Sequence, residues 1–176
     1  MTMDYDKLFE DALLHALYDY SENKIRFFSE RDLQSHLFFE CRKLMEEQHF
    51  SYPLKLYAEK TAFSKHAKVD LVLGDDEVLV ELKLEADYPG VSKPVVFTTK
   101  TEAAGSGSIE SDLEKIEEYS RNGKCAHFVM IDEDGRHVRK MNDERWKAIY
   151  VKLNGPKKVV HYLHVKHDGR QGKVQP

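Results

Sequence analysis

The sequence has only two cysteines, Cys41 and Cys125, and no Cys-x-x-Cys pair. Such cysteine usage suggests neither a disulfide framework nor a structural zinc site, and it predicts a reducing, cytoplasmic setting. No apolar run approaches the roughly 20 residues of a membrane-spanning helix, so we expect no membrane association. The first residues lack the basic and apolar regions of a signal peptide. Walker, GxGxxG, Ser-His-Asp and Cys-His patterns are also absent, which removes the commonest nucleotide-binding and nucleophilic classes.

The chain also lacks an excess of positive charge. Its 27 Lys and Arg residues are outnumbered by 31 Asp and Glu residues, for a formal net charge of −4. This balance argues against non-specific coating of nucleic acid, although it leaves room for a local basic groove. No repeat or domain boundary interrupts the 176 residues. We therefore expect one domain over residues 1–166 and a disordered polar tail over 167–176.

Hydrophobic periodicity predicts an α/β domain built on one mixed sheet. The expected helices are Tyr5–Tyr20, Glu30–His49 and a third from Ser111, which opens a capping box, to about Arg121. The expected strands are Leu54–Lys60, Lys68–Leu73, Val78–Leu84 and Lys124–Ile131, followed by a C-terminal hairpin of Trp146–Leu153 and Val159–Lys166. The long connection Asp87–Gly107 is of a length that is more often functional or mobile than filler.

The strand Val78–Leu84 carries the most informative pattern. Its apolar residues Val78, Val80, Leu82 and Leu84 alternate with charged ones, so Glu81 and Lys83 share a face. The short turn 74–77 joins it to the preceding strand, so the two predict an antiparallel hairpin that brings Asp70 beside Glu81 or Lys83. Two carboxylates and a lysine on one face of a buried sheet are costly unless something holds them, and a divalent cation is the usual partner.

A Glu-x-Lys triplet alone is weak, because Glu22-Asn23-Lys24 is a second copy. That copy lies in a polar break without a partner strand, whereas Glu81-Leu82-Lys83 has the hairpin and flanking helices. The alternative is an edge-strand pair whose polar face is solvated, with Glu81 and Lys83 as a surface charge pair. We favour the site over this alternative.

The order helix–strand–strand–strand–helix–strand, with Asp70 on the second strand and Glu81-Leu82-Lys83 on the third, resembles the PD-(D/E)xK nuclease superfamily. The resemblance covers roughly residues 30–131, with Val69 in place of the proline that names the motif. It implies a restriction-endonuclease-like mixed sheet flanked by helices, here extended by an N-terminal helix and a C-terminal β-hairpin.

The resemblance also implies roles for these residues. Asp70 and Glu81 would bind Mg²⁺ or Mn²⁺, and Lys83 would position or activate the attacking water. Some members add a glutamate from the first core helix, which here would be Glu40 and, less readily, Glu30. From the chemistry alone, hard carboxylate oxygens suit Mg²⁺, the carbonyl of Leu82 would complete the metal shell, and a lysine supplies a compact point charge.

Two further interpretations stay open, and one candidate is excluded. Glu40 sits at the edge of its helix's apolar stripe, so it is either a metal ligand or a flanking charge paired with Arg42 or Lys43. Asp112 and Lys115 either face the site or form a solvated first helical turn, and we prefer the second reading. His161, His164 and His167 do not converge as metal ligands, because three-residue steps along a strand alternate between faces.

Together with the resemblance, these patterns predict a metal-dependent nuclease that hydrolyses phosphodiester bonds of nucleic acid, DNA before RNA, or the nuclease-like domain of a DNA defence or repair system. A homodimer is plausible, since cutting both strands with one site per chain needs two copies. One alternative is a catalytically inactive nuclease-like module that binds nucleic acid or protein. Another is a structural α/β protein with a solvated hairpin, which would bind no metal.

Overall fold

The computed structural model describes residues 4–48, 53–61, 68–85, 109–133, 137, 147–151 and 158–165. The expected connection at 87–107 and the expected tail at 167–176 lie outside these residues. The described elements, in chain order, are α1 (Tyr5–Ser21), α2 (Glu30–Glu47), β1 (Leu56–Thr61), β2 (Lys68–Leu73), β3 (Val78–Glu85), α3 (Ile109–Arg121), β4 (Cys125–Asp132), β5 (Lys147–Val151) and β6 (Lys158–Val165).

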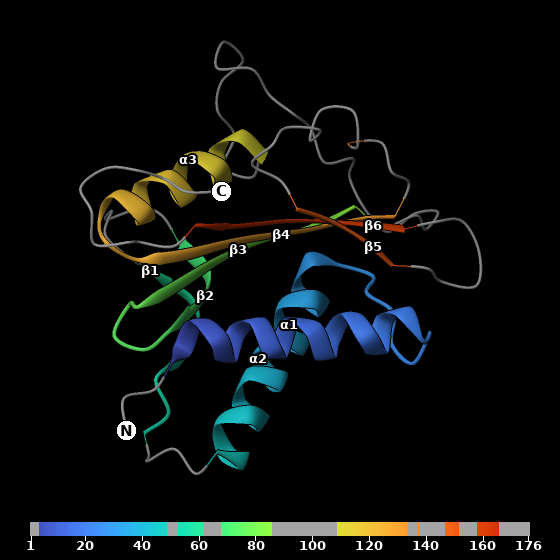
Figure 1. Ribbon diagram of the computed structural model, residues 1–176, viewed down its shortest axis with the longest axis horizontal. Coiled ribbons are helices and arrows are strands. Elements are labelled where there is room, and N and C mark those ends of the chain that lie inside the picture. The colour runs from blue at the N-terminus through green and yellow to red at the C-terminus, as the bar shows by residue number, and fades with distance from the viewer. Residues whose placement is uncertain are drawn as a thin grey trace.

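The strands form one mixed sheet in the order β1-β2-β3-β4-β6-β5. Only β3 and β4 pair in parallel, and the other neighbours are antiparallel. Helices α1 and α2 cover one face of this sheet and α3 covers the other, as Figure 1 shows. The prediction of an α/β domain on a mixed sheet is thus confirmed, together with the β2–β3 hairpin and the C-terminal β5–β6 hairpin. None of the described helices combines the length and apolar composition of a membrane span.

The helix ends follow from their capping residues in two of the three helices. The Asp4 carboxylate accepts from the Lys7 backbone N–H before α1, and the Ser29 hydroxyl accepts from the Asp32 N–H before α2. Both side chains satisfy a backbone donor that the first helical turn leaves without a partner. Helix α3 begins at Ile109, two residues before the start that the Ser111 capping box predicts. Position 112 therefore lies inside the helix rather than at its cap.

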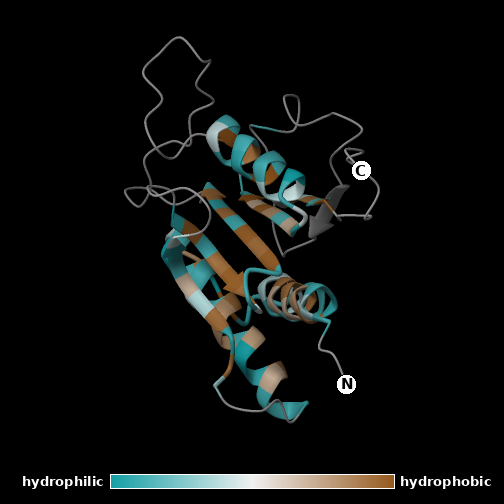
Figure 2. Cartoon of the chain, turned by 90° about the vertical axis from the view of Figure 1, so that its left-hand side faces the viewer, coloured by the Kyte–Doolittle hydropathy of each residue, from teal (hydrophilic) through white to brown (hydrophobic). Residues whose placement is uncertain are grey.

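The sheet has an apolar core on each face. On the face of α1 and α2, Leu71 and Leu73 of β2 pack with Leu82 and its same-face neighbours from β3. On the other face, Leu79 and Phe128 belong to a smaller core under α3. All eight residues of β3 are buried, and the sheet strands carry long hydrophobic stretches in Figure 2. Strand β3 is therefore central, and the alternative of a solvated edge strand is wrong.

The turn between β2 and β3 holds the hairpin in register. Gly74 has a φ of +70°, a left-handed conformation that L residues with a Cβ rarely adopt. Its N–H donates to the Lys55 carbonyl at 2.9 Å, which ties the turn to the segment before β1. A Cβ at this position would lie 2.9 Å from the ring of Tyr5, at the start of α1. The turn therefore needs glycine for its backbone and for close packing under α1.

We predict that Gly74→Ala lowers the free energy of unfolding by at least about 1 kcal/mol, because it adds left-handed strain and a clash with Tyr5. Chemical denaturation measures the change. Gly123→Ala is the matched control, because Gly123 has a similar φ of +77° but lies exposed after α3. An equal loss in both variants would show that the contact with Tyr5 adds nothing.

Candidate active site

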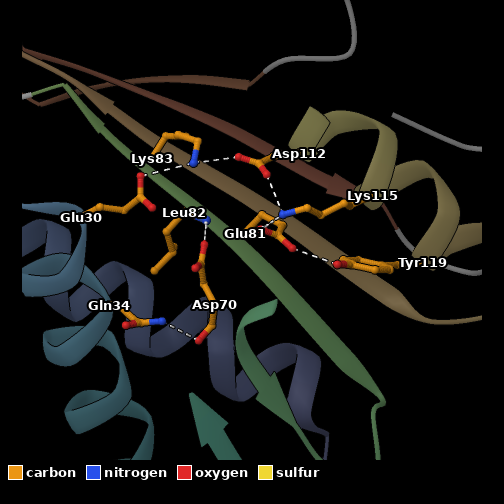
Figure 3. Close-up of polar contacts among 9 residues, drawn as sticks. All are labelled: Glu30, Gln34, Asp70, Glu81, Leu82, Lys83, Asp112, Lys115 and Tyr119. Atoms are coloured by element: carbon orange, nitrogen blue, oxygen red, sulfur yellow. Dashed lines mark hydrogen bonds and ion pairs between the residues drawn. The ribbon is translucent and has the colours of Figure 1, made fainter. Parts of the chain in front are cut away.

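The candidate site lies where β2 and β3 separate. The register of the two strands runs from Leu73 opposite Val78 to Leu71 opposite Val80. One residue further, the Asp70 carboxylate accepts from the Leu82 N–H at 2.7 Å, and Gln34 of α2 donates to the Asp70 carbonyl at 2.9 Å (Figure 3). At this point, side chains replace the backbone hydrogen bonds between the two strands and provide partners for the Leu82 N–H and the Asp70 carbonyl.

The same geometry orients the Leu82 carbonyl. The N–H and C=O groups of one strand residue face the same neighbouring strand, as in a hydrogen-bonded antiparallel pair. Because the Leu82 N–H faces the Asp70 carboxylate, the Leu82 carbonyl also faces the β2 side. Two oxygen donors, one carboxylate and one carbonyl, therefore border the gap between the strands. The hairpin was expected to bring Asp70 beside Glu81 or Lys83, and the direct contact of its carboxylate is with the backbone of Leu82, between those two residues.

Glu81 lies on the opposite side of β3 from Leu82, beneath α3. It is only 2% exposed. Tyr119 donates its hydroxyl to Oε1 of Glu81 at 2.8 Å, and the Lys115 ammonium donates to Oε2 at 2.9 Å. Helix α3 therefore supplies a partner for each oxygen of this buried carboxylate.

Lys83 is held between two helices. Its Nζ lies 2.8 Å from Oδ2 of Asp112 in α3 and 3.3 Å from Oε2 of Glu30 in α2. The other Asp112 oxygen accepts from Lys115 at 2.7 Å. Asp112 is 1% exposed and bridges both lysines, so the preferred reading of Asp112 and Lys115 as a solvated helical turn is wrong. Figure 3 shows the chain of contacts from Glu30 to Tyr119.

The cluster carries more acid than base. Its ionisable members are four carboxylates and two ammonium groups, from Glu30, Asp70, Glu81, Asp112, Lys83 and Lys115. With all of them charged, the cluster has a net charge of −2, equal in size to the charge of one divalent cation. This excess, together with oxygen donors on both sides of β3, fits Mg²⁺ or Mn²⁺ better than a softer metal.

Burial sets the protonation of the two proposed metal ligands. It raises the pKa of Asp70 to about 6, although the Leu82 N–H opposes the shift. It raises the pKa of Glu81 to about 8, against the opposing charge of Lys115. Burial alone would lower the pKa of Lys83, but the carboxylates of Asp112 and Glu30 outweigh it and raise that pKa. The Lys83 ammonium therefore stays charged over the pH range in which Asp70 and Glu81 titrate.

Glu40 lies away from this cluster. It is buried between the first two helices, with Oε2 3.7 Å from Nδ1 of His15 in α1. Ten residues separate it from Glu30 along α2, a rise of about 15 Å. Arg42, an expected partner of Glu40, pairs through its Nε with Glu46 at 2.9 Å. Glu30, the less favoured candidate, is the α2 carboxylate that reaches Lys83.

The sequence reading missed Gln34 and Tyr119 as members of the site. Asp112, Lys115 and Tyr119 follow an i, i+3, i+7 spacing, so they share one face of α3. This face also carries the buried Ile116, so polar residues there indicate side chains that point toward the protein interior. Gln34 carries no such signal, because its role depends on the point at which β2 leaves β3.

Comparison of the chain with protein-family models, with curated proteins and with solved structures gives no match.

The raised pKa values predict how the metal-free protein responds to pH. Each carboxyl stabilises the fold fully below its unfolded pKa of about 4, and that contribution is lost as the pH rises through about 6 for Asp70 and about 8 for Glu81. We expect Glu81→Gln, measured in EDTA, to raise the melting temperature at about pH 9 and to change little at about pH 5.

Glu118→Gln, an exposed change on α3, is the matched control and should be silent at both pH values. A Glu81→Gln variant that is less stable than wild type at about pH 9 would contradict the raised pKa of Glu81.

Proposed function

We propose that the protein is a metal-dependent nuclease with a restriction-endonuclease-like arrangement of the sheet and α3. One observation carries the proposal. Asp70, Glu81 and Lys83 gather where β2 and β3 separate, in a buried cluster that has two more carboxyl groups than ammonium groups. A structural salt-bridge cluster has no need of this excess, since unpaired buried charge destabilises a fold.

Asp70, Glu81 and the Leu82 carbonyl are the residues that would hold the metal. Bound Mg²⁺ or Mn²⁺ would lower the pKa of a coordinated water and stabilise charge on the phosphate. Glu81 must exchange a contact with Tyr119 or Lys115 to join such a shell. Release of Lys115 would leave it with Asp112, so no buried ammonium loses its last partner.

Lys83 is the group that would act on the reacting phosphate and water. Its charge is compact, and Asp112 and Glu30 hold it from two helices, which fixes its position without a metal. A positioned ammonium of this kind stabilises the negative charge that develops during phosphodiester hydrolysis. Asp112 and Glu30 are positioning residues in this account.

A cavity beside the site offers a route for substrate. It measures about 400 Å³ between α2 and β1, and Arg31, Gln34 and Phe38 line it. Gln34 also donates to the Asp70 carbonyl, so the cavity borders the Asp70 side of the site. Arg31 supplies a cation there for a phosphate backbone. We propose nucleic acid as the substrate, DNA before RNA, with a homodimer as the form that cuts both strands.

A second candidate is a nuclease-like module that binds nucleic acid or protein without cleaving it. One observation favours it: both oxygens of Glu81 already have partners in Tyr119 and Lys115. In that case the cluster would serve packing and no metal would enter. The two candidates differ in what the same variants do.

If the protein is a nuclease, Lys83→Ala should keep metal binding and much of the substrate affinity. Cleavage should fall by a factor of about 10²–10⁴, because only the transition state uses this charge fully. Single-turnover cleavage of labelled single- and double-stranded DNA and RNA, with Mg²⁺ or Mn²⁺, measures the rate, and a binding assay on the same variant measures affinity.

Lys68→Ala is the control, because Lys68 is an exposed lysine on β2 whose ammonium pairs with surface Glu59 at 3.1 Å. It should cleave as wild type does. Equal cleavage by wild type and Lys83→Ala would remove Lys83 from the reaction, and no cleavage by wild type would favour the binding module.

The metal ligands have a separate test. Asp70→Ala and Glu81→Ala should each abolish the rise in melting temperature that Mn²⁺ gives to wild type. Glu40→Gln should leave that rise intact, because Glu40 packs against α1, whereas Glu30→Gln should alter it through Lys83. An equal Mn²⁺ shift in wild type, Asp70→Ala and Glu81→Ala would disprove the ligand set.

A further inference from the structure

A second cluster of ligating side chains lies on the opposite face of the sheet, beneath α1. His127 of β4 and His164 of β6 are directly opposed partners in the antiparallel register. Their rings stack with centroids 4.2 Å apart and planes 14° from parallel. Phe9 of α1 packs on the His127 ring at 4.6 Å, so α1 closes the site from above.

Asp6, in the first turn of α1, brings a carboxylate oxygen to both rings. Its Oδ1 lies 2.9 Å from Nε2 of His127 and 2.8 Å from Nε2 of His164. Among the residues that the structure describes, these three side chains form a group whose ligand atoms all lie within 4.8 Å of one another. Ligand atoms of a tetrahedral zinc ion lie roughly 3.3 Å apart. Asp6 Oδ1 would therefore need to move only slightly away from the two Nε2 atoms for a metal ion to fit between them.

The outward-facing nitrogen of each ring also has a partner. The Tyr162 hydroxyl lies 2.9 Å from Nδ1 of His127, and Oε1 of Glu10 lies 3.2 Å from Nδ1 of His164. Histidines that bind metal through Nε2 hold their Nδ1 proton against such a group, and a carboxylate is a frequent choice. Both rings are thus oriented with Nε2 toward the same carboxylate oxygen.

The charges of the cluster also suit a divalent cation. The carboxylates of Asp6 and Glu10 flank the ring of His164, at 2.8 Å from Nε2 and 3.2 Å from Nδ1. A divalent metal bound to a neutral His164 would balance the two negative charges of these carboxylates.

We propose that Asp6, His127 and His164 bind one Zn²⁺ ion, with Glu10 and Tyr162 orienting the two imidazoles and water completing the shell. Imidazole with carboxylate is a donor set that zinc accepts, and three protein ligands leave one position open. The ion would join the first turn of α1 to β4 and β6. This site is separate from the Asp70–Glu81 cluster, because His127 and Glu81 lie on opposite faces of the sheet.

The test uses the full chain, stripped with EDTA and titrated with Zn²⁺ at about pH 8, where protons compete less for imidazole. Excess Mg²⁺ is present throughout to occupy the proposed catalytic cluster. We expect about one tightly held zinc per chain, against a competing chromophoric chelator. His127→Asn and His164→Asn should weaken binding by more than about 100-fold, and Glu10→Gln by about 10–100-fold.

His15→Asn is the matched control, because His15 is an exposed histidine of α1 that contacts Glu40 and not this cluster. It should bind zinc as wild type does. Failure of wild type to retain zinc, or wild-type affinity in both histidine variants, would overturn the proposal.

X-ray absorption at the zinc edge of the wild-type protein keeps the test valid if a buried variant fails to fold. We expect a first shell of nitrogen and oxygen at about 2.0–2.1 Å with outer-shell scattering from two imidazoles. A zinc environment without imidazole would refute the site. Neither result bears on nuclease activity, so the two proposals stand or fall separately.

Discussion

The burial of β3 on both faces is the constraint on which the rest of the structure depends. A central strand has no solvated face, so the charges of Glu81 and Lys83 cannot be hydrated and must be met by protein groups. Helix α3 supplies Asp112, Lys115 and Tyr119 as partners for these charges, and α2 supplies Glu30. Both helices must therefore pack close enough to β3 to contact the side chains of Glu81 and Lys83.

The buried cluster has more carboxyl groups than ammonium groups, and this surplus has a cost in stability. A cluster selected only for stability would match its charges or replace them with apolar residues. Here burial raises the pKa values of Asp70 and Glu81, which is the mark of carboxylates that lack full compensation. In our account a divalent cation supplies what is missing, and the separation of β2 from β3 gives it a place between Asp70 and Leu82.

Much of the fold could be predicted because the spacing of apolar residues and the capping of helices depend on residues close together in the sequence. The alternation from Val78 to Leu84 and the Ser29 cap were sufficient to place β3 and the start of α2. Contacts between distant elements were not predictable in this way. Glu40 and Glu30 share a helix, and only the docking of α2 decides that Glu30 reaches Lys83. The spacing of histidines along a single strand does not reveal the pair of His127 and His164, because these residues lie opposite each other on two neighbouring strands.

Paramagnetic broadening by Mn²⁺ in amide NMR spectra tests the central claim most directly, because it locates the cation without requiring turnover. In the presence of one equivalent of Zn²⁺ per chain, substoichiometric Mn²⁺ should first broaden the amides of Asp70 and of Leu82 and its neighbours in β3, and Mg²⁺ should reverse the effect. Broadening centred elsewhere, or none at these amides, would contradict a metal between β2 and β3.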